Sequence, residues 1–144
     1  MLSVNPERNL LRTKMIDAWK KYQKKELLDP YEHKIIKVIL EHPEYHDVFN
    51  NPDQYLEKDF ATNDRSGNPF LHISFHLAMT DQIEADQPAG IQKIYQSLLQ
   101  KNAGDHLHVE HRMISVLAHT LWELANDKNP WDDKKYLKAL SECC

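Results

Sequence analysis

The chain has 144 residues, of which 41% are apolar and 28% are charged, and its formal net charge is -4 at pH 7. This balance predicts a single globular domain over residues 1–144 that can fold without disulfides or a metal. The densest basic stretch, Lys20 to Lys25, fits the solvated side of an amphipathic helix. We therefore expect no nucleic-acid partner, because phosphate binding needs several basic side chains on one face.

The compartment is inferred from what the sequence lacks. No stretch approaches the roughly 18 apolar residues of a membrane span, and the first residues carry no apolar block of a signal peptide. We expect a cytoplasmic protein with no membrane partner. The two cysteines, Cys143 and Cys144, are adjacent and cannot staple a fold, so residues 143–144 are expected to be a frayed tail.

Helix starts are marked by prolines that follow Asn or Asp. Such a side chain caps free backbone N–H groups, and proline suits the first helical position. Five pairs have this form: Asn5-Pro6, Asp29-Pro30, Asn51-Pro52, Asn68-Pro69 and Asn129-Pro130. No alternating run of β-branched residues is found between turn signals. The sequence predicts an all-α fold, a compact helical bundle of about six to eight helices.

The helix expected from Pro30 introduces the first candidate ligands. Its apolar stripe continues one turn further to His42, which is therefore predicted to face the core. Pro43 should kink the chain there, and His46 follows within the segment "HPEYH". The polar residues 57–67 that come later are expected to form a mobile loop.

The helix expected from Pro69 carries His72 and His76, four residues apart in an otherwise apolar run. At this spacing two imidazoles lie on one helix face and can bind one ion. Random placement of nine histidines in 144 positions gives about 0.5 pairs at this spacing, and the chain has two, 42/46 and 72/76. The excess favours ligands, although ordinary core histidines would also fit.

The helix expected after Gly104 contributes Glu110, near the middle of an apolar face, with His111 beside it. A carboxylate in that position needs a cation, a metal or a proton, unless the helix end leaves it exposed. Other site chemistries are disfavoured. The HExxH spacing of zinc proteases is absent, as are a Gly-rich phosphate loop and a GxSxG motif.

Several segments in order resemble a bacterial family known as domain of unknown function 1841: "DAWKKY", "ILEHPEYH", "NPFLHISFHLA", "DQPAGI", "EHRM" and "LAHTLWE". The resemblance extends from about Trp19 to Trp122. It implies a small cytoplasmic bacterial protein to which no activity is assigned.

The leading hypothesis is a helical protein that binds a transition metal, Zn or Fe, in a histidine-rich core site. Six residues are the candidate ligands: His42, His46, His72, His76, Glu110 and His111. One alternative is a non-enzymatic interaction module, with a protein partner and structural histidines. Another is a metal-dependent hydrolase or transferase, which requires an open coordination position.

Overall fold

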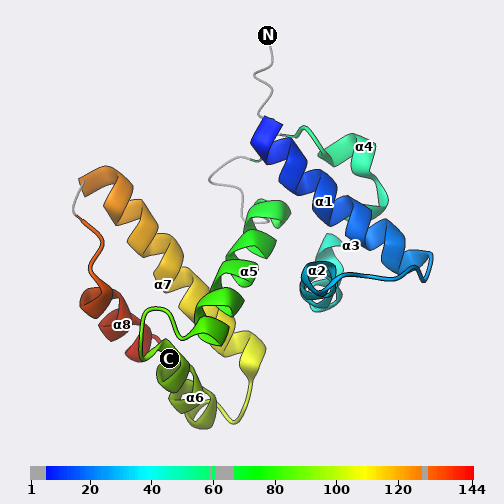
Figure 1. Cartoon of the computed structure of the whole chain (residues 1–144). Coiled ribbons are helices and arrows are strands. Elements are labelled where there is room, and N and C mark those ends of the chain that lie inside the picture. The colour runs from blue at the N-terminus through cyan, green and yellow to red at the C-terminus, as the bar shows by residue number, and fades with distance from the viewer. Residues whose placement is uncertain (1–5, 59, 61–66, 128–129) are drawn as a thin grey trace. The chain divides into compact units, whose positions relative to one another are not determined.

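The computed structural model describes residues 6–58, 60, 67–127 and 130–144. Within these ranges the secondary structure is helical, with no strand, so the predicted all-α class is confirmed (Figure 1). The elements in chain order are α1 (Pro6–Gln23), α2 (Pro30–Leu40), the 3-10 helix η1 (Pro43–Tyr45), α3 (His46–Asn50), α4 (Pro52–Tyr55), α5 (Pro69–Ala85), α6 (Ile91–Lys101), α7 (His106–Asp127) and α8 (Asp133–Ser141).

The chain divides into two compact units, Met1–Ser74 and Phe75–Cys144. The boundary falls inside α5, which is one continuous helix.

In the first unit α1 packs against α2. The start of α2 has the predicted cap. The Glu32 backbone N–H donates to the Asp29 carboxylate over 2.7 Å, and the Glu32 carboxylate accepts from the Asp29 backbone N–H over 3.0 Å. Lys21 of α1 pairs with Glu32 over 2.9 Å, so the same side chain also links the two helices.

The kink predicted at Pro43 is present. Helix α2 ends at Leu40, and η1 then makes one tight turn before α3 begins at His46. The apolar stripe of α2 is buried through Ile35, Val38 and Ile39. His42, one turn beyond Val38, is 2% exposed, which confirms that this side chain faces inward.

Asn68 caps the first turn of α5, because its side-chain oxygen accepts from the backbone N–H groups of Phe70 and Leu71. Phe70 packs edge-on against Phe49 of α3. This contact anchors the beginning of α5 within the first unit.

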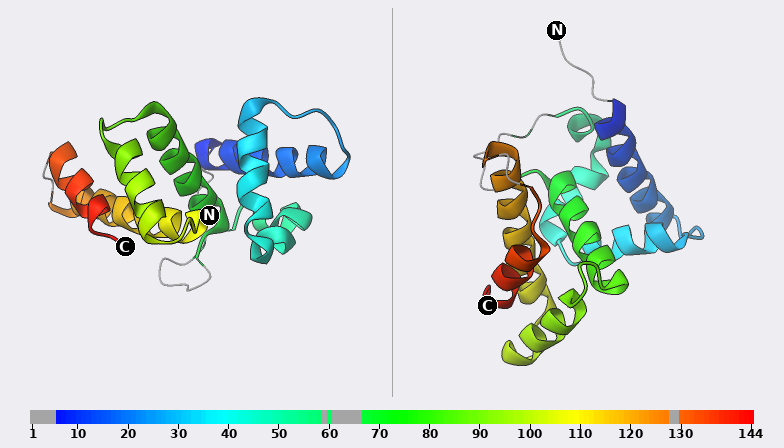
Figure 2. Two further views of the ribbon diagram at one scale, coloured as in Figure 1. Left: turned by 90° about the horizontal axis from the view of Figure 1, so that it is seen from below. Right: turned by 60° about the vertical axis from the view of Figure 1, so that its left-hand side comes forward.

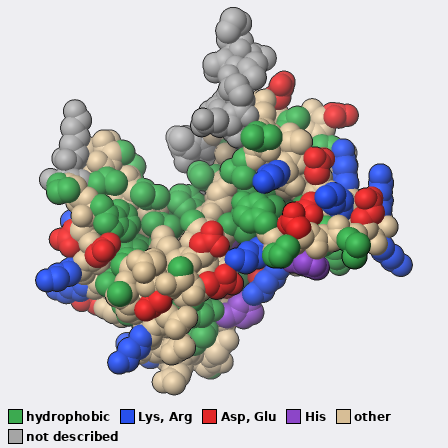
Figure 3. All heavy atoms as spheres, in the orientation of Figure 1, with side chains coloured by type: hydrophobic (Ala, Val, Ile, Leu, Met, Phe, Trp, Pro, Cys, Tyr) green, Lys and Arg blue, Asp and Glu red, His purple; other side chains and the backbone are tan. Residues whose placement is uncertain are grey.

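In the second unit α6, α7 and α8 pack on one another, and Figure 2 shows them lying side by side. Their buried side chains form one apolar cluster with Met79 of α5, made up of Met79, Ile91, Leu98, Val109, Met113, Ile114, Leu117, Tyr136 and Leu140. Over α7 and α8, on the left of Figure 3, hydrophobic side chains lie among charged ones.

Three chain segments differ from the sequence-based expectation or lie largely outside the described residues. Helix α8 begins at Asp133 rather than at Pro130, because the Asp132 carboxylate accepts from the backbone N–H groups of Lys134 and Lys135 and so provides the cap. Cys143 and Cys144, expected as a frayed tail, are partly buried against the core cluster. Most of the loop expected over residues 57–67 lies outside the described residues.

None of the described helices has the length and apolar character that crossing a bilayer requires.

Candidate metal centre

His42 is held by the last turn of the helix that precedes it. Its Nδ1 lies 2.7 Å from the carbonyl oxygen of Val38, four residues earlier. A carbonyl oxygen only accepts hydrogen bonds, so Nδ1 must carry the proton and donate it. In the neutral ring the lone pair is then on Nε2, which is the nitrogen that can bind a metal.

The Nε2 atom of His42 lies 3.2 Å from Nε2 of His72, and both residues belong to the first unit. The rings meet nearly at right angles, at an interplanar angle of 72°. Two nitrogens bound to one tetrahedral zinc ion at 2.0–2.1 Å lie about 3.3–3.4 Å apart. The observed separation is therefore close to that of two ligands on one ion.

A second contact between two imidazole rings lies in the second unit. His76 of α5 and His111 of α7 have ring centroids 5.0 Å apart, at an interplanar angle of 67°. His76 is 2% exposed, and His111 is partly buried. His72 and His76 are one turn apart on α5, so a single helix carries one member of each contact.

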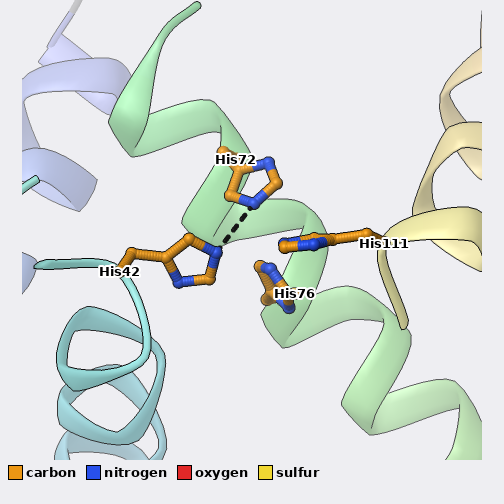
Figure 4. A group of neighbouring side chains, drawn as sticks. All are labelled: His42, His72, His76 and His111. Carbon is orange, nitrogen blue, oxygen red and sulfur yellow. Dashed lines mark hydrogen bonds between the residues drawn. The ribbon is translucent and has the colours of Figure 1, made fainter. Parts of the chain in front are cut away.

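The four imidazoles form one group, and Figure 4 shows them turned toward one another. Each offers one nitrogen, and these nitrogens all lie within 4.8 Å of one another. His42 follows α2, His72 and His76 come from α5, and His111 comes from α7. The group thus collects imidazoles from positions up to 69 residues apart in the sequence, the difference between 111 and 42.

Two of the six candidate ligands are not part of this group. His46 comes after the η1 turn, where its Nε2 contacts the carbonyl oxygen of Ile39 over 3.0 Å. Its ring packs on Trp19, with centroids 4.9 Å apart. Glu110 precedes His111 on α7 and is partly buried, but it is not among the grouped ligands. Of the six candidate ligands, the group contains His42, His72, His76 and His111.

Tyr45 belongs to the same neighbourhood and was not among the predicted site residues. Its ring lies parallel to that of His42, at 6° and 5.2 Å, and edge-on to His72 at 5.8 Å. The sequence signal is the spacing of three across Pro43, because residues i and i+3 eclipse in a 3-10 turn. Burial raises the pKa of Tyr45 to about 12, so the phenol is neutral at physiological pH.

Four imidazole nitrogens restrict the range of metals that the group could bind. Imidazole nitrogen suits Zn, Fe, Cu and Ni, whereas Mg and Ca prefer oxygen ligands. Access of water is limited, because two of the four rings are buried and the other two are partly buried. Such a group can bind a first-row transition ion, or it can share protons among its own nitrogens.

The helices and this group define an all-α protein with a cluster of four histidines that is compatible with a metal site. The chain belongs to the family described as Domain of unknown function (DUF1841), whose model matches residues 7–142. The resemblance found in the sequence is thereby confirmed. The comparison with curated proteins gives no match, and neither does the comparison with solved structures.

Proposed function

We propose that the protein binds one transition-metal ion, Zn or Fe, through His42, His72, His76 and His111. The observation that carries the proposal is the grouping of one nitrogen from each ring within 4.8 Å. Nitrogens bound to one ion at about 2.0–2.1 Å would lie about 3.3–3.4 Å apart, which the Nε2 atoms of His42 and His72 approach at 3.2 Å.

The hydrogen bond from His42 to Val38 gives independent support. Metal-bound histidines almost always donate their other ring N–H to a carbonyl or a carboxylate, which fixes the tautomer and the ring orientation. His42 has such a partner at 2.7 Å. The other nitrogen of the ring, Nε2, faces the Nε2 of a second imidazole, His72, over 3.2 Å.

Binding, rather than catalysis, is the function we propose. Four imidazoles complete the tetrahedral shell of zinc, whereas a catalytic zinc keeps one position open. A groove of about 400 Å³ between α7 and α8 includes Arg112, Trp131 and Tyr136 among its lining residues, but none of the four histidines. Its position gives no support to a substrate beside the ion. The hydrolase or transferase alternative would require a bound water on the metal.

The test is the metal content of protein prepared without an affinity tag, measured by elemental analysis and then by titration of the chelator-stripped protein with Zn(II) and Fe(II). We expect close to one equivalent per chain. Replacing His72 or His76 by Ala should remove specific uptake. The matched controls are His33→Ala and His108→Ala, because these histidines lie on α2 and α7 outside the group of four.

Two outcomes would contradict the proposal. One is wild-type protein that carries no metal and takes up neither Zn(II) nor Fe(II). The other is equal loss of binding in the control variants, which would assign the metal to other histidines. In that case an interaction module with structural histidines becomes the better explanation.

A further inference from the structure

Three rings lie together at the end of α2: His42, Tyr45 and His72, all in the first unit. We infer that Tyr45 is a positioning residue that, with the Val38 carbonyl, holds His42 and His72 as a preformed half of the metal centre, in which both imidazoles bind through Nε2. This inference rests on the proposed function, because it says how that site is organised before the ion arrives.

The first step concerns the protons. Since the Val38 carbonyl requires the His42 proton on Nδ1, the His42 Nε2 can only accept. The His72 Nε2, 3.2 Å away, must then be the donor in the metal-free protein (Figure 4). Nε2 of His72 therefore carries hydrogen at the place where the ion would bind.

The second step is the exchange that metal binding requires. An ion held by His42 and His72 would accept a lone pair from Nε2 of each ring. The proton on Nε2 of His72 would have to leave, and the neutral ring would be protonated on Nδ1 instead, so that the ring keeps the same number of protons. His42 needs no such change, because its tautomer already suits ligation.

The third step is the role of Tyr45. Its ring covers a face of His42 in parallel contact and meets His72 edge-on. Its position is fixed in turn by η1, where the backbone N–H of Tyr45 donates to the His42 carbonyl over 2.9 Å. Both imidazoles are thus oriented before an ion binds. Metal binding then has to restrict fewer side-chain conformations, which lowers its entropy cost.

The experiment compares Tyr45→Leu with Tyr45→Phe. Phenylalanine keeps the stacked ring, so we expect Zn(II) affinity close to that of the wild type. Leucine removes it, and affinity should fall about 10- to 100-fold, the usual effect of losing a group that orients a ligand. Affinity is measured by competition with a chromophoric chelator. Tyr31→Leu, at the exposed first turn of α2, is the control.

A merely structural role for Tyr45 would lower the melting temperature of the metal-free protein without changing Zn(II) affinity in the folded variant, and that result would overturn the inference. If Tyr45→Leu does not fold, ¹⁵N NMR of the wild-type imidazoles decides. We expect His42 protonated on Nδ1 and His72 on Nε2 without metal, and both ligated through Nε2 with Zn(II).

An Nε2–H tautomer for His42 in the metal-free protein would contradict the inference. The proposed function can fail separately. If wild-type protein never binds metal, the proposed metal site is refuted. If wild-type protein binds metal and the Tyr45 variants bind it with the same affinity, only the positioning role of Tyr45 is refuted.

Discussion

Arg12 is a charged side chain in an almost fully buried position, with an exposed fraction of 2%. Its Nη1 donates to the carbonyl oxygens of Leu56 and Lys58 over 2.9 and 2.8 Å. The guanidinium also lies over the ring of Phe70, 4.7 Å from its centroid. One residue of α1 therefore fixes the chain after α4 and supports the start of α5.

Arg12→Met should lower the free energy of unfolding by about 2–4 kcal/mol, because the carbonyls of Leu56 and Lys58 lose a charged donor and the contact with the Phe70 ring is lost. Urea denaturation measures the change. Lys20→Met, an exposed substitution on the same helix, should leave the midpoint almost unchanged. An Arg12 variant as stable as that control would show that the hydrogen bonds of the guanidinium contribute little to stability.

The histidines show what can be predicted at the scale of single residues. His42 was predicted to face inward because helical periodicity extends from Val38 to the next turn. His46 is not in the group of four, because η1 winds the chain with three residues per turn and so changes the direction in which the next side chain points. The side chain meets Trp19 instead. Helical periodicity predicts the direction of a side chain only as long as the type of helix stays the same.

The start of α2 depends on charge as well as on hydrogen bonding. The pKa of Glu32 is lowered, first by its hydrogen bond from the Asp29 backbone and then by its contact with Lys21. A carboxyl group whose pKa is lowered by folding stabilises the native state above its unfolded pKa. That contribution is lost as the pH falls through the folded pKa.

Glu32→Gln should therefore lower the melting temperature at pH 7, and the difference from wild type should shrink as the pH falls below about 4, where an ordinary Glu is protonated. Thermal unfolding at several pH values is the measurement. Glu142→Gln, at an exposed position on the other unit, is the comparison. A difference that stays constant down to about pH 3, below the usual pKa of Glu, would assign the effect to packing rather than to charge.

Gly104 lies between α6 and α7 with φ at +77°, and a Cβ there would have no atom within 4 Å. Gly104→Ala should therefore destabilise the protein only through backbone strain, by roughly 1–2 kcal/mol. Gly104→Asn should cost less, because Asn tolerates this conformation better than Ala does. Denaturant titration of both variants checks the order. Equal stability of the Ala variant and the wild type would contradict the strain argument.

Helix starts were the most predictable part of the fold, since caps are local. Asp29 and Asn68 cap α2 and α5 as the Asn-Pro and Asp-Pro pairs indicate. The prediction at Pro130 was wrong by three residues, because Asp132 provides a competing cap closer to the apolar stripe of α8. Local sequence identifies candidate caps, but packing selects among them.

The grouping of four histidines could be predicted only in part. The pair on α5 is visible in the sequence, since its spacing is that of one helical turn. His42 and His111 lie 30 or more residues from this pair in the sequence, and local periodicity carries no information about contacts at such separations. Glu110 was selected for its place on an apolar face, yet its neighbour His111 is the one that reaches His76.

Metal loading should also change the stability of the whole chain. An ion that binds only the native state stabilises it by mass action, by about 2.7 kcal/mol at a free concentration 100 times the dissociation constant. A chelator should therefore lower the melting temperature of wild-type protein and leave His76→Ala unaffected. Differential scanning fluorimetry with and without chelator gives the comparison. Equal chelator effects in both proteins would mean that the stabilising ion is bound elsewhere.

X-ray absorption spectroscopy of the zinc-loaded protein reports the atoms bound to the ion and so tests the four-histidine centre itself. We expect one shell of about four nitrogens at about 2.0–2.1 Å, with the outer-shell scattering of imidazole rings. His111→Ala should lose one of these imidazoles, and His108→Ala should keep all of them. A shell dominated by oxygen, or a spectrum unchanged in His111→Ala, would contradict the four-histidine centre.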